Sequence, residues 1–472
     1  MATITHNKIF AGTFIHSKTR EKLEYLHNTA IAVSAEGVIV AICSKDDSQA
    51  AVQAVLKETQ WPGDTETLIL GDKQFFFPGL IDTHVHASQY PNVGIFGKST
   101  LLDWLNTYTF PLESSLANPS AAHRVYTACV RRTLAHGTTA AAYYATQSAT
   151  STAVLADVCL HLGQRALVGR VCMDQPDMCP EYYRDESPAA ALAASVESIE
   201  YIRQRDPLFD LVTPVLTPRF APSCSPRAMA DLAALAARHN LPIQTHISEN
   251  TSECALVGRL FPDLSSYSAV YHAHNLLTPR TILAHAIHLS DAEAALLASN
   301  NCKISHCPCS NSALTSGAAR VRWLWSHGLS IGLGTDMSGG YSPSILEAAR
   351  HAALVSRHVA MHTADDAEKE GVKLTVDEVL YLATRGGADV IGMADRVGGF
   401  EVGKQWDAIH IQLATVDESG LRNDDELGGD AGNVDLFGTE SWEEIVAKWL
   451  YNGDDRNCKK VWVKGRLVHQ RR

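Results

Sequence analysis

The chain has 472 residues, enough for about three average domains or for one elaborated α/β barrel with a small additional domain. It carries 40 Lys and Arg against 52 Asp and Glu, a formal net charge of −12. Because this charge repels polyanions, nucleic acid and anionic membranes are not expected as partners. With 46% hydrophobic and 19% charged residues, the composition predicts a globular protein with a sizeable core.

The start of the chain, MATITHNKIFAG, lacks the apolar segment of a secretory signal and the Arg-rich character of a transit peptide. No run approaches the roughly 18 apolar residues that a membrane span needs. Both features predict a cytoplasmic protein without a membrane partner. The 11 cysteines form no CxxC pair, so we expect free, buried thiols rather than a disulfide framework.

Both ends of the chain have the pattern of short β-strands. Residues 8–17 and 29–42 are rich in β-branched and aromatic residues, and Glu36-Gly37 interrupts the second run as a turn would. Residues 407–413 and 459–469 show the same pattern on either side of an acidic, Gly-rich loop at 416–432. We expect the two ends, residues 1–76 and 403–472, to form one small composite β-sandwich domain.

Between the ends, eight apolar runs alternate with Ala-rich segments of helical character. The runs are continuously apolar, as in strands that are covered on both faces. Each is followed by enough chain for a helix, so residues 77–402 are predicted to form an α/β domain of the (β/α)8 type, a TIM-like barrel. An open, doubly wound sheet is the structural alternative. The eight runs begin near residues 75, 136, 165, 211, 241, 281, 302 and 329.

Polar residues that can hold a metal ion stand at the carboxyl ends of four of these runs, where active sites lie in such barrels. The first run ends in His84-Val85-His86. Because side chains at i and i+2 of a strand share a face, both imidazoles can bind one ion. The later runs add His246 with Glu249, then His285, then Asp336. Ligand types at the same end of four strands are a stronger signal than one HxH motif.

A second HxH motif, His272-Ala273-His274, provides an internal control. It precedes the Thr278-Pro279 pair that introduces the next apolar run, so we expect it at a helix end or in a loop, away from a metal. His288 and His306 are expected to be hydrogen-bonded histidines that support the mouth of the barrel. The segment at 94–100, GIFGKST, has two residues instead of four between its first Gly and Gly-Lys, so it is not a phosphate loop.

Five segments at the strand ends form one recognisable set: PGLIDTHVHAS (78–88), QTHISE (244–249), LAHAIHLS (283–290), HCPCSN (306–311) and GLGTDMSGG (332–340). Together they resemble the amidohydrolase superfamily, and within it the mononuclear, zinc-dependent nucleobase deaminases. Further stretches narrow the resemblance to the branch that acts on guanine: HASQY (86–90), LDWL (102–105), TPRF (217–220), GGYS (339–342) and LYNGDDRN (450–457). The resemblance extends from about residue 75 to the end.

The resemblance implies one zinc ion per subunit. Its ligands would be His84, His86, His246 and Asp336, a set that suits zinc and leaves a position open for water. Binuclear members of the superfamily use a carbamylated lysine on the fourth strand, but here no lysine occurs between Lys98 and Lys303. The fourth run ends instead near Arg219, whose permanent positive charge cannot ligate a cation. A single metal is therefore expected.

The resemblance also implies a hydrolytic deamination, for which the metal makes hydroxide available near neutral pH. Asp336 would take up the proton of the attacking water. Glu249 would deliver a proton to ring N3 of the base and then help the amine to leave as ammonia. His285 would hydrogen-bond the hydroxide and the developing tetrahedral centre. Glu249, His285 and Asp336 are thus the expected catalytic residues.

The implied substrate is a small purine base, guanine, which would be converted to xanthine in purine catabolism. Arg219 can donate to the O6 carbonyl, Gln89 can donate to and accept from the ring edge, and Phe220 can pack against the rings. Trp104 lies in the apolar LLDWL segment and is a further candidate. The full set expected to touch substrate is His86, Gln89, Trp104, Arg219, Phe220, His246, Glu249 and Asp336.

Relatives in this branch are homodimers, and the resemblance carries that expectation to this chain. Two alternatives to guanine turnover stay open at this point. One is a neighbouring deaminase that acts on 8-oxoguanine or on a triazine such as ammeline. The other is a non-catalytic scaffold with the amidohydrolase fold, although such scaffolds lose metal ligands and all four are present here.

Overall fold

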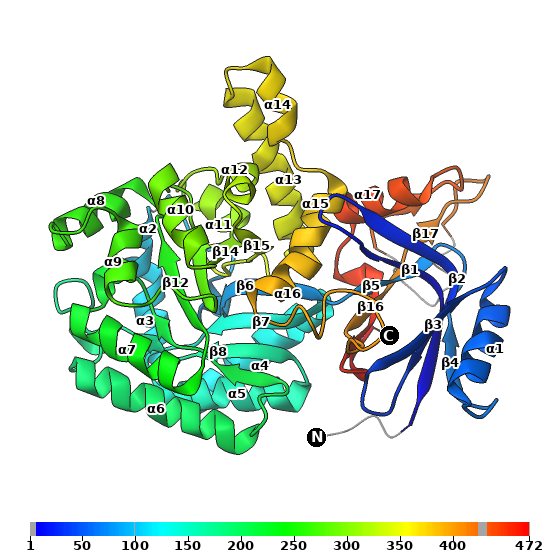
Figure 1. The fold of residues 1–472 in the computed structure, drawn as a ribbon, viewed down its shortest axis with the longest axis horizontal. Coiled ribbons are helices and arrows are strands. Elements are labelled where there is room, and N and C mark those ends of the chain that lie inside the picture. Colours follow the sequence, from blue (N-terminus) through cyan, green and yellow to red (C-terminus); the bar gives the residue numbers. More distant parts are fainter. Residues whose placement is uncertain (1–5, 99, 423–431, 472) are drawn as a thin grey trace.

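The computed structural model describes residues 6–98, 100–422 and 432–471. The middle of the chain builds an α/β barrel, and the two ends together build a β-sheet beside it (Figure 1). Most of the acidic loop predicted at 416–432 lies outside the described residues. Within the described part of the chain, no helix is both long enough and apolar enough to cross a membrane.

The terminal sheet joins strands from both ends of the chain. Its eight strands are β1 Lys8–Ser17, β2 Leu23–Val33, β3 Ile39–Ser44, β4 Glu66–Ile69, β5 Gln74–Pro78, β16 Ala408–Gln412, β19 Cys458–Val463 and β20 Arg466–Gln470. Their order is β20-β19-β16-β5-β1-β2-β3, with β4 paired to β1. The antiparallel pair β5 and β16 is the junction between the N-terminal and C-terminal strands, and it forms the pairing that the sequence alone left open.

Side chains of the terminal sheet alternate between two buried layers. Ile9 and Ala11 of β1 pack on helix α1 (Ser48–Thr59), whereas Phe10 faces an aromatic cluster on the other side. In that cluster Phe10 stacks on Trp406 with ring centroids 4.3 Å apart and meets the edge of Trp462 at 5.3 Å. Trp462 lies on β19, three strands from β1, a distance of about 14 Å in a flat sheet. The sheet therefore curls around the aromatic cluster, as a sandwich does.

The barrel contains one strand from each of the eight predicted runs. They are β6 Leu80–His86, β7 Thr138–Tyr144, β8 Arg165–Gly169, β10 Val212–Pro214, β12 Ile243–Ile247, β13 Thr281–His285, β14 Lys303–His306 and β15 Ser330–Leu333. They pair in parallel as β10-β8-β7-β6 and β12-β13-β14-β15. A bridge between Leu216 and Ile243 joins the two groups on one side, and the Asp336 N–H donates to the His84 carbonyl on the other.

Helices follow most of these strands and cover the outside of the barrel (Figure 1). They are α4 Pro119–Ala135, α5 Ala149–Leu162, α6 Pro188–Arg205, α7 Pro226–His239, α8 Thr251–Leu260, α9 Tyr267–Ala273, α10 Asp291–Ser299, α11 Pro308–Ala313, α12 Val321–Ser326, α13 Ile345–His362, α15 Val376–Tyr381 and α16 Gly387–Val390. Buried Ala and Leu faces such as those of α7 and α13 account for this packing.

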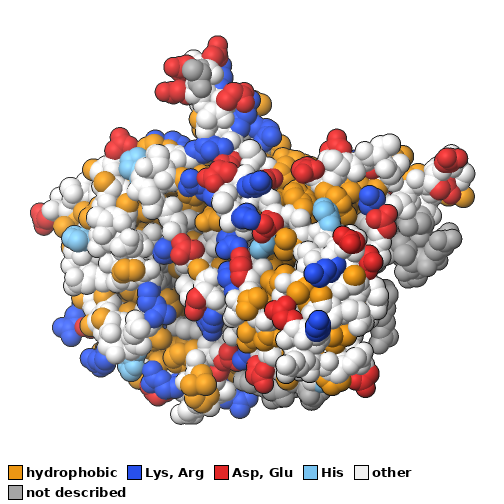
Figure 2. Space-filling view, turned by 45° about the vertical axis from the view of Figure 1, so that its right-hand side comes forward, with side chains coloured by type: hydrophobic (Ala, Val, Ile, Leu, Met, Phe, Trp, Pro, Cys, Tyr) orange, Lys and Arg blue, Asp and Glu red, His pale blue; other side chains and the backbone are white. Residues whose placement is uncertain are grey.

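Several shorter elements complete the fold. They are α2 Leu101–Trp104, α3 Phe110–Ser115, α14 Asp366–Val372, α17 Trp442–Asn452, and the parallel pairs β9 Val171–Cys172 with β11 Thr217–Pro218 and β17 Ala414–Thr415 with β18 Asp435–Leu436. Helix α14 protrudes at the top of Figure 1. On the face shown in Figure 2, acidic and basic side chains are interspersed over the body of the molecule.

The first of the eight predicted apolar runs forms two strands instead of one. The first apolar run begins at residue 75, but residues 74–78 form β5 of the terminal sheet, and the barrel strand β6 begins only at Leu80. Gly79 makes the connection between them. A Cβ at this position would lie 2.0 Å from the Thr139 hydroxyl, so only glycine permits this close approach. Uninterrupted apolarity concealed the junction because both strands are buried.

The architecture is that of a (β/α)8 barrel, and the predicted fold class is confirmed. The chain of parallel pairings puts all eight strands in one orientation, so their carboxyl ends meet at one mouth. The open, doubly wound sheet is excluded. In an open sheet the first and last strands are separate edges, whereas here β6 is hydrogen-bonded to the residues that follow β15.

Candidate active site

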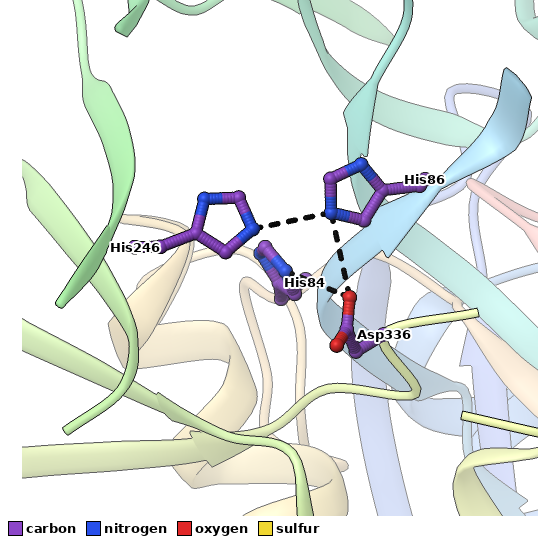
Figure 3. A group of neighbouring side chains, drawn as sticks. All are labelled: His84, His86, His246 and Asp336. Carbon is purple, nitrogen blue, oxygen red and sulfur yellow. Dashed lines mark hydrogen bonds and ion pairs between the residues drawn. The ribbon is translucent and has the colours of Figure 1, made fainter. Parts of the chain in front are cut away.

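Four potential metal ligands converge at the mouth of the barrel (Figure 3). His84 and His86 project from the same face of β6, His246 comes from β12, and Asp336 follows β15. Asp336 Oδ1 lies 3.1 Å from His84 Nε2 and 3.4 Å from His86 Nε2. The Nε2 atoms of His86 and His246 are 3.2 Å apart. His84, His86 and Asp336 are buried, and His246 is partly exposed.

These distances fit a tetrahedral metal ion. Zinc–nitrogen and zinc–oxygen bonds of about 2.0–2.1 Å place neighbouring ligand atoms of a tetrahedron about 3.3 Å apart. The measured separations of 3.1, 3.4 and 3.2 Å match that spacing. His84 Nε2 is buried and makes no hydrogen bond of good geometry among the described residues beside its ion-pair contact with Asp336, and a metal bond would satisfy it. The donor set, three imidazoles and one carboxylate, is one that zinc accepts.

A hydrogen bond to the backbone fixes the tautomer of His246. Its Nδ1 lies 2.6 Å from the backbone carbonyl of Arg219, which can only accept a hydrogen bond. Nδ1 therefore carries the proton, and the lone pair of Nε2 faces the other ligands. Burial lowers the pKa of the His84, His86 and His246 imidazoles, so all three are neutral and able to ligate at physiological pH.

Backbone strain accompanies the site. Ser248, His285, Ala286 and Asp336, all at strand ends around the mouth, have positive φ values of 48°, 74°, 51° and 46°. Side chains other than glycine rarely adopt this conformation, and it persists where surrounding contacts hold it. At Asp336 those contacts include its N–H bond to the His84 carbonyl. Asp82, buried beneath, accepts from the Thr335 hydroxyl and N–H at 2.5 and 3.0 Å and so ties β6 to the end of β15.

Glu249 and His285 lie beside the four ligands. His285 Nε2 is 3.5 Å from Glu249 Oε2 and 3.7 Å from Asp336 Oδ2, and its Nδ1 is 2.9 Å from Asn311 Oδ1. Asn311 thus fixes the His285 ring without using the nitrogen that faces the site. Glu249 Oε1 accepts a hydrogen bond from the Ser316 hydroxyl at 3.1 Å.

The pKa values of the two carboxyl groups, Glu249 and Asp336, are shifted in opposite directions. Burial raises the pKa of Glu249 to about 7, so its carboxyl group can be protonated or ionised near neutral pH. Burial also opposes ionisation of Asp336, but the surrounding histidines, His84 first, outweigh it and hold the pKa of Asp336 below its usual range. Burial opposes protonation of His285, yet the Glu249 and Asp336 carboxylates raise its pKa above the ordinary value. One carboxylate is thus kept ionised and the other poised to carry a proton.

A cavity opens next to these groups. Every residue that the sequence predicted to touch substrate lines it. Its lining residues are His86, Gln89, Leu101, Trp104, Leu105, Arg219, Phe220, His246, Glu249, Leu314 and Asp336. Trp104 is buried at the pocket wall, packed with Leu101 and Leu105, so it belongs to the pocket and to the core at once.

Several residues of the site were missed by the sequence analysis. Glu113, Asn311 and Ser316 support Arg219, His285 and Glu249, and the leucines 101, 105 and 314 supply apolar wall. Asn311 lies within the quoted HCPCSN segment, so a signal for it existed. Glu113 and Ser316 stand in short helical and loop segments whose side-chain directions a linear pattern does not show.

The remaining histidines lie elsewhere. His272 is in the last turn of α9 and His274 is its C-cap, whose Nδ1 bonds the Val270 carbonyl, as expected for the control motif. His288 Nε2 bonds the Ser316 carbonyl at 2.8 Å, as predicted. The prediction for His306 was wrong, because neither ring nitrogen has a hydrogen-bond partner among the described residues. Burial lowers the pKa of His306 to about 3, so the ring is a neutral core group.

Comparison with known proteins decides the family. The amidohydrolase family matches residues 75–468. The chain belongs to the amidohydrolase family. The family match begins within β5, covers the whole barrel and continues into the C-terminal strands of the terminal sheet.

Individual amidohydrolases resemble the chain over nearly its whole length. A probable guanine deaminase of Schizosaccharomyces pombe is 46% identical over 98% of this chain and 83% of its own. The guanine deaminase of Homo sapiens is 40% identical over 98% of this chain and 96% of its own. A solved guanine deaminase from C. acetobutylicum with guanine bound in its active site superimposes with a TM-score of 0.85 and 32% identity, covering 98% and 100% of the two chains.

Proposed function

We propose that this amidohydrolase is a guanine deaminase, which hydrolyses guanine to xanthine and ammonia. The observation that carries the proposal is that a single cavity is lined both by ligands for a metal and by the polar and aromatic groups that a purine requires. The similarity to guanine deaminases over 98% of the chain supports the same substrate.

The metal would be one zinc ion per subunit, held by the Nε2 atoms of His84, His86 and His246 and by Oδ1 of Asp336. These four atoms lie close enough together to share one ion. When bound, zinc supplies a Lewis acid that brings the pKa of water near neutrality. His285 Nε2 lies near the set but is oriented by Asn311 toward Glu249 and Asp336, so it acts as a hydrogen-bonding group rather than a ligand.

Two carboxylates divide the proton transfers. Asp336 directs Oδ1 to the histidines of β6 and Oδ2 toward His285, so Oδ2 accepts the proton of the water that attacks C2. Glu249, with its raised pKa, delivers a proton from its carboxyl group to N3 as the C2–N3 double bond opens. Glu249 then takes the proton of the hydroxyl now on C2 and passes it to the amino group, so that the C2–N bond breaks and xanthine and ammonia are left. The proton held by Asp336 restores the Glu249 carboxyl group.

Recognition of the base would use other residues that line the cavity. The Arg219 guanidinium can donate to O6, which is an acceptor in guanine and is replaced by a donor in adenine. Gln89 adds a polar contact at the ring edge. Phe220 and Trp104 offer apolar surface for the ring faces, and Leu101, Leu105 and Leu314 close the remainder of the wall.

Ammonia release tests the proposal directly. Purified holoenzyme is given guanine, 8-oxoguanine and ammeline in parallel, and ammonia is measured for each. We expect rapid release from guanine and slower release from the other two. No release from guanine by metal-loaded protein would refute the function, and a preference for ammeline or 8-oxoguanine would move the enzyme to a neighbouring activity.

The family resemblance further suggests a homodimeric assembly and a role in purine catabolism. The sequence patterns suggest a cytoplasmic location and a two-part division into the barrel at 77–402 and a composite domain of 1–76 and 403–472. Light scattering tests the assembly, and metal analysis per chain tests the count of one zinc. Arg219→Ala separates recognition from metal binding, since it should weaken guanine turnover and leave the metal content unchanged.

A further inference from the structure

Glu113 is a buried carboxylate behind the cavity wall. It lies on the short helix α3 and is fully inaccessible to solvent. It does not line the cavity, yet it holds two residues that do, Arg219 and Gln89. No step of the proton transfers described above uses it. A buried carboxylate with no part in the chemistry needs another reason for its place, because burying a charge is costly unless it is paired.

Five hydrogen bonds converge on the two oxygens of Glu113. Oε2 accepts from Arg219 Nη1 at 2.6 Å and from the Tyr183 hydroxyl at 2.8 Å. Oε1 accepts from Gln89 Nε2 at 2.8 Å, from the Ser88 hydroxyl at 3.3 Å and from Arg219 Nη2 at 3.4 Å. The carboxylate is therefore saturated by donors and held in one orientation.

This carboxylate dictates which way the Gln89 amide points. A carboxylate can only accept hydrogen bonds, so the NH₂ end of the amide must face Glu113. The amide oxygen is then turned to the opposite side, where the Ser338 N–H lies 3.5 Å away. Without Glu113 only the long contact with the Ser338 N–H would distinguish the two ends of the amide, and Gln89 could more easily turn either a donor or an acceptor to the substrate.

Glu113 also compensates the positive charge of the Arg219 guanidinium and sets its direction. Both η nitrogens of Arg219 donate to the carboxylate, and the guanidinium lies 5.2 Å from the centre of the Phe110 ring. The Arg219–Glu113 pair is neutral overall and lies close to His246, one of the residues that would hold the metal cation. Loss of Glu113 would leave an unpaired positive charge beside that cation and a guanidinium free to rotate.

We propose that Glu113 is a specificity-determining positioning residue, which fixes the donor and acceptor pattern that Gln89 and Arg219 present to the 6-oxo edge of a purine. The inference rests on the proposed function, since it names how that site selects its base. Glu113 acts through its two neighbours and does not touch the substrate itself.

The test compares two competitive inhibitors that are not deaminated at C2. Hypoxanthine keeps the O6 carbonyl and the N1–H of guanine, whereas purine has neither. In Glu113→Gln we expect the inhibition constant of hypoxanthine to rise by about tenfold or more. A change of this size corresponds to the loss of a hydrogen bond to a charged group. That of purine should change by less than about threefold, and the zinc content should not change. A purely structural role would weaken both inhibitors equally, and an unchanged ratio overturns the proposal.

Tyr183→Phe is the matched control. It removes one donor to Glu113 and leaves the contacts with Gln89 and Arg219 in place. Its ratio of the two inhibition constants should stay within about threefold of the wild-type ratio. If Tyr183→Phe changes the ratio as much as Glu113→Gln does, the effect comes from general disturbance of the wall and the proposal fails.

A second measurement covers the case in which Glu113→Gln does not fold. In a crystal structure of the wild-type holoenzyme with hypoxanthine, Glu113 must keep its hydrogen bonds to both Gln89 and Arg219, and either bond lost on ligand binding overturns the proposal. Failure of the proposed function has a different signature. It appears as wild-type protein that releases no ammonia from guanine, whereas failure of this inference leaves the wild type active.

Discussion

The mouth of the barrel and the terminal sheet each contain a buried cluster of side chains, but the two clusters differ in chemistry. The mouth packs His84, His86, His246 and His285 against carboxylates, and several of its residues are in a left-handed backbone conformation. The terminal sheet buries an almost entirely apolar cluster, in which Phe10, Phe14, Phe76 and Phe400 surround Trp406. The first arrangement costs folding free energy and the second supplies it.

This difference separates two kinds of residue. Substitutions of side chains in the mouth should change turnover and have little effect on the free energy of unfolding, because a more apolar residue would pack there equally well. Side chains of the sheet should control stability with little effect on turnover, because they join the two chain ends far from the cavity. Substitutions on the two sides of the comparison should therefore have opposite consequences.

Loss of the metal should have the largest effect on turnover. Chelation, or His84→Ala, removes the only Lewis acid that the proposed chemistry provides, so we expect guanine turnover to fall by roughly three decades or more. Added zinc should restore the chelated protein and not the variant. Conversion of guanine to xanthine is followed by ultraviolet absorbance, with bound metal measured in the same samples.

His272→Ala is the matched control for this experiment. It removes a histidine from the second HxH motif, on α9, where no metal ligand lies nearby among the described residues. Its metal content and turnover should equal those of the wild type. Full activity in metal-free wild type would contradict the proposed mechanism.

Glu249→Gln should have the next largest effect. The amide keeps the shape of the side chain but cannot carry a proton to N3, so turnover should fall by about two to four decades. Metal content should stay the same. Because burial raises the pKa of Glu249 to about 7, its ionised form is disfavoured in the fold, and the neutral amide should unfold at the same or a slightly higher temperature. Ammonia release and thermal unfolding measure the two effects.

Glu293→Gln offers a comparison with another buried glutamate. Glu293 caps α10 through Ser290 and lies outside the cavity. This substitution should lower the unfolding temperature slightly and leave turnover within about twofold of the wild type. If Glu249→Gln retained near-normal turnover, Glu249 would not be the proton carrier.

Trp406→Ala should show the opposite behaviour. The indole is inaccessible to solvent and stacks on Phe10, so its removal should lower the free energy of unfolding by about 3–5 kcal/mol. Trp406→Phe, which keeps an aromatic ring, should lose less. Denaturant unfolding measures the loss, and turnover per bound metal below the unfolding transition should match the wild type. A fall in that turnover would show that the sheet and the mouth are coupled.

Much of the mouth was predictable because its residues are local to strands. His84 and His86 share a strand face, and His246, His285 and Asp336 end runs whose apolarity marks them as barrel strands. A parallel barrel then brings the carboxyl ends of these strands together, independent of the conformation of the loops. The residues expected to touch substrate could be named only through the family resemblance.

The supporting residues depend on the path of the loops, which has no periodic signal. Glu113 contacts Arg219 across 106 positions in the chain, and Ser316 contacts Glu249 across 67. The same reason explains the division of the first apolar run at Gly79, because an apolar strand of the sheet and one of the barrel look alike in sequence. Burial can be read from composition, but the partner of a buried polar group cannot.

The smallest predicted effect is a shift in the pH dependence of kcat/KM, and it tests the pKa of Glu249 at the mouth of the barrel. In the proposed mechanism Glu249 acts as an acid, so kcat/KM is supported below its pKa of about 7 and is lost as the pH rises through that value. The Ser316 hydroxyl donates to the Glu249 carboxylate and lowers this pKa. Ser316→Ala should therefore raise it and move the alkaline limb to higher pH, by about half a unit to one unit.

Ser312→Ala is the control for that shift, since the Ser312 hydroxyl bonds the Pro308 carbonyl and does not contact Glu249. The hydrogen bond of His288 to the backbone of residue 316 survives in Ser316→Ala, so the loop keeps its anchor. Below pH 6 the variant and the wild type should have equal kcat/KM, because Glu249 is protonated in both. A limb that stays in place or moves to lower pH would show that the alkaline loss of activity belongs to another group.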